Sequence, residues 1–294
     1  MLQSITLFGR TINLYDFFNN FAFVGQILVL LFVRKELAEI STLPKLANMY
    51  LNRKKKDTLL WRWGFVILLV LISDYVIVTI NNLSATPLSS FFLGKSDANF
   101  FPNIFIAPLT IFLLCALLKN SPLKTLDLCA PATAVALVFY KIACFCWGCC
   151  YGVEAESFGM LNHRTDRIEF PIQLVEVACA VVMLVILLVL VRKKNIRHGI
   201  LYPLFMLMYC GSRFVSEFWR DDYPAVLGPL KGYHIQCIIG FVEGAIFMFV
   251  VLKWGEQITD FFEFKNQAFL EHHATKIQEK NRLHRNNKAG KKKK

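Results

Sequence analysis

The sequence has few charged residues, and acidic residues are the scarcer kind. Charged residues are 18% of the 294 positions, with 21 Asp and Glu against 33 Lys and Arg, whereas hydrophobic residues make up 55%. The mean hydropathy is +0.46. An ordinary soluble domain has roughly 45–50% apolar residues. The composition therefore excludes an ordinary soluble domain and predicts an all-α integral membrane protein.

A cleavable signal peptide is also absent from the first 14 residues, which lack a basic segment followed by an apolar core and a small-residue cleavage site. We therefore expect the first apolar run to remain as a membrane helix. A transmembrane helix needs roughly 20 mostly apolar residues. About seven runs approach this length, and they are residues 15–33, 63–81, 103–118, 125–147, 171–191, 200–218 and 235–253.

Basic residues fall on one side of these predicted spans. They follow the first, third and fifth spans and fill the C-terminal tail, which ends in KAGKKKK. The opposite loops, 82–102, 148–170 and 219–234, have no comparable basic block. Because Lys and Arg are enriched in cytoplasmic loops, we predict an outside N-terminus and a cytoplasmic C-terminus. The same loops explain the net charge of +12, so a nucleic-acid partner is not expected.

The chain is predicted to have three parts. Residues 1–254 form a polytopic membrane domain. Residues 255–270, GEQITDFFEFKNQAFL, mix aromatic and charged side chains and are predicted to lie on the inner membrane face as an amphipathic helix. Residues 271–294 are polar and basic, which predicts a disordered cytoplasmic tail attracted to anionic lipids.

Ionisable and polar residues inside the predicted spans are functional candidates, because ionisable groups are costly to insert into a membrane. Arg213, Glu217 and Arg220 are spaced i, i+4, i+7 on one helical face. They could simply pair to allow insertion. However, polar residues from five spans share the outer half of the membrane, which favours an anion-binding cavity open to the outside, with guanidinium groups suited to phosphate. The others are Tyr15, Asp16, Lys141, Gln173, Glu176 and Gln236.

Two motifs resemble the core of the bacterial prolipoprotein diacylglyceryl transferases. They are GCCYG at residues 148–152 and Y-x-x-x-R-F-x-x-E-x-x-R at residues 209–220. Taken together with several weaker matches, their order, spacing and membrane side agree with the family over roughly residues 5–250. Weaker matches are Tyr15, Asp127 with Ala130 and Pro131, Pro171 with Gln173, Leu174 and Glu176, and Gln236.

The resemblance implies transfer of the diacylglyceryl unit of phosphatidylglycerol to the thiol of a lipobox cysteine in an exported precursor, with glycerol phosphate leaving. It implies a multi-pass protein of the bacterial cell membrane with an outward-facing active site, whose partners are phosphatidylglycerol or a related anionic phospholipid and a lipoprotein precursor, without cofactor or metal. It implies catalytic roles for Arg213, Lys141 and Tyr15. The implied substrate-binding residues are Glu217, Arg220, Tyr209, Gln173, Glu176, Gly148, Gly152 and Gln236.

The sequence also departs from the family. The family's G-R-x-G-C-F is replaced by residues 140–145, so that Lys141 stands where the family has arginine, and Val175 replaces a tyrosine. The family's H-G-G-L motif is absent, and His163 and His234 are substitutes for a general base by membrane side and chemistry only. These changes indicate a divergent member, and a non-catalytic membrane protein that binds lipids or precursors on the same scaffold remains an alternative.

Four of the nine cysteines lie in CFCWGCCYG, residues 144–152. Zinc would need four ligands, usually from two paired clusters, and only one cluster is present, which argues against a metal. We favour a tight turn, because Gly148 and Gly152 permit it and small thiols pack well there. A membrane thiol oxidoreductase that uses Cys146 and Cys149 as a redox pair is the competing interpretation.

Overall fold

The structure is a computed structural model that describes residues 4–7, 10–33, 100–118, 120–193, 196–222 and 224–291. The predicted second span, 63–81, lies outside the described residues. The described elements are β1 (Ser4–Leu7), β2 (Arg10–Asn13), α1 (Leu14–Phe32), α6 (Phe100–Leu118), α7 (Pro122–Trp147), β3 (Met160–Asn162), β4 (Arg167–Glu169), α8 (Ile172–Val191), α9 (Leu201–Ser216), the 3₁₀ helix η2 (Glu217–Trp219), β5 (Ala225–Leu227), β6 (Leu230–Lys231) and α10 (Gly232–Lys291).

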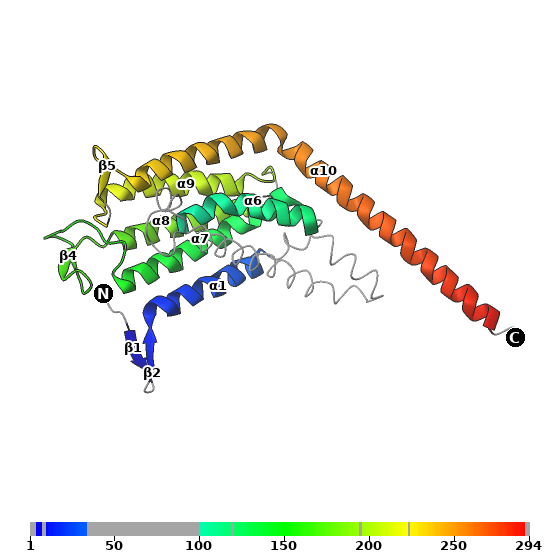
Figure 1. The fold of residues 1–294 in the computed structure, drawn as a ribbon, viewed down its shortest axis with the longest axis horizontal. Helices are drawn as coiled ribbons and strands as arrows, with labels where there is room; N and C mark the ends of the chain where they lie inside the picture. The colour runs from blue at the N-terminus through cyan, green and yellow to red at the C-terminus, as the bar shows by residue number, and fades with distance from the viewer. Residues whose placement is uncertain are drawn as a thin grey trace.

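The helices form a bundle around α7, which packs against α1, α6, α8 and α9. Figure 1 shows the antiparallel strand pairs β1–β2, β3–β4 and β5–β6 at one end of this bundle. That end holds the start of α1, the end of α7, the start of α8 and the end of α9. Residues from separate parts of the sequence can therefore meet there.

Four described helices are long and apolar enough to cross a membrane: Leu14–Phe32, Pro122–Trp147, Ile172–Val191 and Gly232–Glu279. They coincide with the first, fourth, fifth and seventh predicted spans. Their outward faces carry exposed apolar side chains, such as Val182 and Val185 on α8 and Ile246 and Phe249 on α10. The predicted helical membrane class is thus confirmed, while the count of seven spans stays a prediction, since α6 contains a shorter apolar helix, Ala107–Leu117, and α9 has 16 residues.

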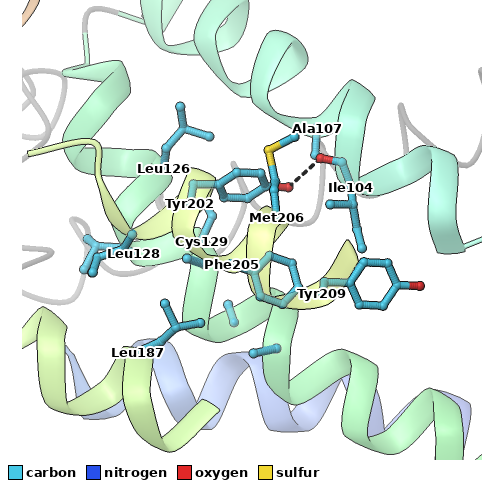
Figure 2. Packing of buried hydrophobic residues seen from close by; sticks show 14 of the residues in the cluster. Ile104, Ala107, Leu126, Leu128, Cys129, Leu187, Tyr202, Phe205, Met206 and Tyr209 are labelled. Atoms are coloured by element: carbon cyan, nitrogen blue, oxygen red, sulfur yellow. Dashed lines mark hydrogen bonds between the residues drawn. The ribbon is translucent and has the colours of Figure 1, made fainter. Parts of the chain in front are cut away.

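The core between α6, α7, α8 and α9 is built from apolar side chains, and Figure 2 shows Phe205 and Met206 of α9 among them. Pro108 lies inside α6 and has no backbone N–H for the carbonyl of Ile104, one turn earlier. The hydroxyl of Tyr202 donates to that carbonyl at 3.2 Å, drawn as the dashed line in Figure 2. The backbone hydrogen bond that this proline removes is therefore replaced by one from a side chain of α9.

Asp127 ties α7 to the start of α9. Its buried carboxylate accepts hydrogen bonds from the backbone N–H of Gly199 at 2.6 Å and of Leu201 at 2.9 Å. These groups precede or open α9, where N–H donors have no helical partner and the helix dipole favours a negative charge. Gly199 has φ +94, a conformation that favours glycine. The match at Asp127 thus has a structural explanation.

The C-terminal region differs from the prediction of a span, an amphipathic helix and a disordered tail. Residues 232–291 form the single helix α10, and Figure 1 shows that its later part turns away from the bundle and projects beyond it. The reason is local: from residue 256 to residue 289 the sequence has neither proline nor glycine. Near the bend, Lys124 of α7 pairs with Glu263, and Arg197 pairs with Glu256 at 3.4 Å.

Candidate active site

The carboxylate of Glu176, in the second turn of α8, is the centre of a buried charge cluster. It contacts Lys141 Nζ of α7 at 2.7 Å and Arg213 Nη1 of α9 at 2.5 Å. Arg220 Nη1 lies 3.4 Å from Oε2 of Glu176, and the hydroxyl of Ser216 donates to Oε1 of Glu176 at 3.1 Å. Three of the polar residues that the sequence places in the outer half of the membrane, Lys141, Arg213 and Arg220, therefore meet around a single acid.

A second acid, Glu217, lies between the two arginines. Its Oε2 is 2.8 Å from Arg213 Nη2 and 3.6 Å from Arg220 Nε. Arg220 also pairs with Asp222 through two nitrogens, with Nε donating to Oδ1 at 3.0 Å. The i, i+4, i+7 spacing thus predicts the contacts of Glu217, but the contacts of Glu176 and Asp222 come from elsewhere in the fold.

Six charged side chains of the cluster balance one another in formal charge. The side chains of Lys141, Arg213 and Arg220 face those of Glu176, Glu217 and Asp222, and all six are at most 11% exposed. Burying an unpaired charge is strongly unfavourable, so partners of opposite sign are needed. Burial alone would lower the pKa of Arg220, but Cys150, Glu176 and Asp222 hold that pKa well above its usual value. Arg220 is therefore cationic, and acids take up many of the donors of the three basic side chains.

A pocket lies beside this cluster. One part of its lining is polar, with Lys141, Glu176, Arg213, Ser212 and Ser216. Another part is apolar, with Leu137, Cys179 and Met183, and Tyr209 completes the lining. The predicted residues Lys141, Glu176, Arg213 and Tyr209 thus line one small pocket together with apolar side chains.

The turn after α7 has the glycine geometry that the sequence predicts. Gly148 ends α7 with φ +73, in the left-handed region, and its N–H bonds to the carbonyl of Cys144 at 3.0 Å. Gly152 is needed for a different reason, since an added Cβ would lie 2.3 Å from the carbonyl oxygen of Phe170. Gly152 also forms a β-bridge with Arg220. The turn is therefore packed directly against the segment that carries a cation of the cluster.

Three other predicted site residues, Gln173, Tyr15 and Gln236, are not part of the pocket lining. Gln173 is fully buried and donates from Nε2 to the carbonyl of Cys149 at 2.8 Å, so it supports the turn. The ring of Tyr15 packs on Trp147, with centroids 5.7 Å apart. Gln236 lies in the first turns of α10, near Tyr233.

Neither histidine lines the pocket. His163 is exposed in the β3–β4 hairpin. His234 is buried against Phe214 and Phe218, with ring centroids 5.0 and 4.4 Å away, and its Nδ1 accepts from the N–H of Lys231 at 2.9 Å. Their assignment as a substitute base gains no support from this placement.

Several contributors were not predicted. Tyr233 places its ring 5.0 Å from the guanidinium carbon of Arg213, within cation–π range. Lys231 donates from Nζ to the carbonyl oxygens of Glu217, at 3.3 Å, and Arg220. Ser216 does have a signal in the sequence, because it follows Arg213 by three residues and so lies on the same face of α9.

The cysteines are arranged differently from the predicted pair. The sulfur atoms of Cys144, Cys149 and Cys150 lie within 4.8 Å of one another, and Cys146 is outside this group. The Cys146–Cys149 pair of the oxidoreductase interpretation is thus not the close one. In the described residues Cys144 and Cys150 approach more closely, with sulfur atoms 4.0 Å apart.

Comparison with known sequences places this arrangement in a family. The model of the prolipoprotein diacylglyceryl transferase family matches residues 11–250. A phosphatidylglycerol–prolipoprotein diacylglyceryl transferase of Clostridium tetani is 26% identical over 188 residues, or 62% of this chain and 75% of that protein. Transferase 2 of Clostridium perfringens is 30% identical over 140 residues (45% and 54%), and the Chlorobaculum tepidum enzyme is 30% identical over 167 residues (56% and 55%). The chain thus spans three quarters of the first relative and about half of the others.

Proposed function

Because this chain belongs to the prolipoprotein diacylglyceryl transferase family, we propose that it transfers a diacylglyceryl group from phosphatidylglycerol to the thiol of a lipobox cysteine in an exported prolipoprotein. The observation that carries the proposal is the pocket in which Lys141 and Arg213 face apolar side chains. A glycerophospholipid needs both surfaces, one for its phosphate and one for its glyceryl and acyl carbons.

In this reaction the cysteine sulfur attacks the glyceryl carbon that is bonded to the ester oxygen of the phosphate. The new S–C bond replaces the C–O bond, whose electron pair stays on the phosphate oxygen, and glycerol phosphate leaves. The thiol proton is released. Negative charge grows on the phosphate as the C–O bond breaks, so fixed cations beside that oxygen lower the barrier.

Lys141 and Arg213 are the cations proposed for this task. Glu176 contacts Lys141 Nζ, which has three N–H donors, and a phosphate oxygen would take another of them. Arg213 has five donors on a planar guanidinium whose Nη1 and Nη2 face Glu176 and Glu217. The two acids hold the cations in place, and a bound phosphate accepts hydrogen bonds from the same two cations.

The other predicted residues have supporting roles in this proposal. Arg220 and Glu217 fix the orientation of Arg213 and Glu176, and Tyr209 lines the pocket. Gly148, Gly152 and Gln173 hold the turn that closes over the cluster, as their backbone contacts support. Tyr15 and Gln236 belong to the outer rim, where the precursor thiol would enter.

The proposal includes a multi-pass topology in the bacterial cell membrane, with seven spans, the N-terminus outside and the C-terminus inside. Residues 1–254 form the membrane domain, and α10 continues into the cytoplasm. The strand pairs and the pocket then face the outer leaflet, where exported precursors carry their lipobox. The gathering of the strand pairs at one end of the bundle, opposite the projecting end of α10, supports this orientation (Figure 1).

Complementation tests the function directly. A conditional strain depleted of its own diacylglyceryl transferase should grow when it expresses this chain, and the Arg213→Ala variant, at matched membrane levels, should not restore growth. Purified protein should also transfer labelled diacylglyceryl from phosphatidylglycerol to a lipobox peptide. No growth and no transfer by the wild-type protein, with labelled lipid still bound, would replace this proposal with the non-catalytic alternative.

A further inference from the structure

Three thiols gather where α7 meets its C-terminal turn. The Sγ atoms of Cys144, Cys149 and Cys150 all lie within 4.8 Å of one another, and those of Cys144 and Cys150 are 4.0 Å apart. Cys150 adopts φ +58. A residue other than glycine in this region carries strain of order 1–3 kcal/mol, which the surrounding structure must impose. The turn thus holds Cys150 in an unfavourable conformation while its sulfur lies against Cys144.

Contacts from three segments fix the backbone of this group. The N–H of Cys149 donates to the carbonyl of Cys144 at 3.2 Å. Asn162 of β3 donates from Nδ2 to the carbonyl of Gly148 at 3.0 Å, and Gln173 of α8 donates to the carbonyl of Cys149 at 2.8 Å. Both amides are fully buried. The positions of the three sulfur atoms are therefore set by the fold before any ligand arrives.

The spacing fits three-coordinate metal binding. Thiolate sulfur binds a metal such as zinc at about 2.3 Å, so three sulfur atoms in a plane around one ion lie about 4.0 Å from each other. The 4.0 Å separation of Cys144 and Cys150 already has this value, and side-chain rotation brings Cys149 in from within 4.8 Å. Among the described residues no further His, Cys, Asp or Glu joins this group.

Thiolates are soft ligands that select ions such as Cu⁺ and Zn²⁺, and structural zinc sites use four ligands. A single cluster of three cysteines is too small for four-coordinate zinc but is sufficient for a three-coordinate ion. The turn that carries these cysteines is joined to Arg220 through the Gly152–Arg220 β-bridge, so the segment that carries this cation adjoins the three thiols. We propose that Cys144, Cys149 and Cys150 bind one soft metal ion, such as Cu⁺, through three thiolates, with release of the thiol protons.

The test uses purified full-length protein in detergent, reduced and handled without oxygen. Cu⁺ is titrated in competition with a coloured Cu⁺ chelator, and one equivalent per chain should be withheld. Cys144→Ser and Cys150→Ser should each weaken binding by at least about tenfold, since one ligand worth about 1.4 kcal/mol already gives that factor. Cys146→Ser is the matched control, because it changes a thiol of the same segment outside the group and should bind as the wild type does.

X-ray absorption of the copper-loaded protein should show sulfur neighbours at about 2.3 Å. Equal thermal unfolding of the variants excludes loss of fold as the reason for weak binding. Failure of the wild type to withhold Cu⁺, or equal weakening by Cys146→Ser, overturns the proposal. A Cys144–Cys150 disulfide in protein alkylated within intact membranes overturns it in favour of a redox pair. These readouts do not depend on lipid transfer, so they are separate from the fate of the proposed function.

Discussion

Replacing Arg213 by lysine keeps the charge but removes the planar fork. Arg213 uses Nη1 for Glu176 at 2.5 Å and Nη2 for Glu217 at 2.8 Å, and these acids belong to different elements. One ammonium nitrogen cannot reproduce both contacts in the same geometry. A hydrogen bond to a charged group contributes about 1.5–3 kcal/mol. If that loss falls on the transition state, transfer in Arg213→Lys drops by about 10- to 100-fold.

The assay measures kcat/KM for transfer of labelled diacylglyceryl from phosphatidylglycerol to a lipobox peptide, with thermal unfolding in detergent as the check on folding. Lys141→Arg is the matched control. It exchanges the same two residue types in the opposite direction, restores the family's residue beside the same acid, and should retain activity or raise it. Unchanged kcat/KM in Arg213→Lys would refute the proposed role of the fork.

Three further outcomes follow from the structure. Gly152→Ala should lower the unfolding temperature, because the new Cβ would lie 2.3 Å from the carbonyl oxygen of Phe170 and overpacking costs about 1–3 kcal/mol. Gly211→Ala is the control and should leave the unfolding temperature unchanged, because the space around Gly211 is open. Equal effects of the two substitutions would contradict this explanation. Asp127→Asn should destabilise the protein by about 1–3 kcal/mol in denaturant unfolding, because the amide oxygen replaces only one of the two carboxylate oxygens that accept hydrogen bonds at the start of α9. Unchanged stability would show that Asp127 does not hold the start of α9. Alkaline phosphatase fused after Lys294 should be inactive, and strong activity would reverse the proposed orientation.

The sequence predicts which residues meet but not how they pair. Depth in the predicted spans brings Lys141, Glu176 and Arg213 to one level, and the structure places them in one pocket. Glu176 contacts both cations because of the way α7, α8 and α9 are rotated about their axes. The sequence periodicity of a uniformly apolar helix does not predict that rotation. The spacing of Arg213, Glu217 and Arg220 therefore predicts the pairs with Glu217 but not those with Glu176.

Long-range contacts explain the other differences. Asp222 and Lys231 reach the cluster from the loop and strands between α9 and α10, for which the sequence shows no periodic pattern. The polar composition of residues 271–294 predicts a disordered tail. However, residues 256–289 include no helix-breaking residue and Lys124 pairs with Glu263, and the structure has one continuous helix here. The structure describes residues 271–291 as helix, and their place on the cytoplasmic side stays a prediction.

The near balance of charges in the cluster determines how a lipid can find the pocket. Three cations face three acids within a few ångströms and Lys231 adds one further cation, so little net charge acts outside the protein, and at physiological salt the Debye length is only about 8 Å. Anionic lipids are thus not drawn toward the site from a distance, and they reach it by lateral diffusion in the leaflet. Discrimination between head groups then takes place after contact, through exchange of donors between carboxylate and phosphate, and the rate of lipid capture should depend only weakly on ionic strength.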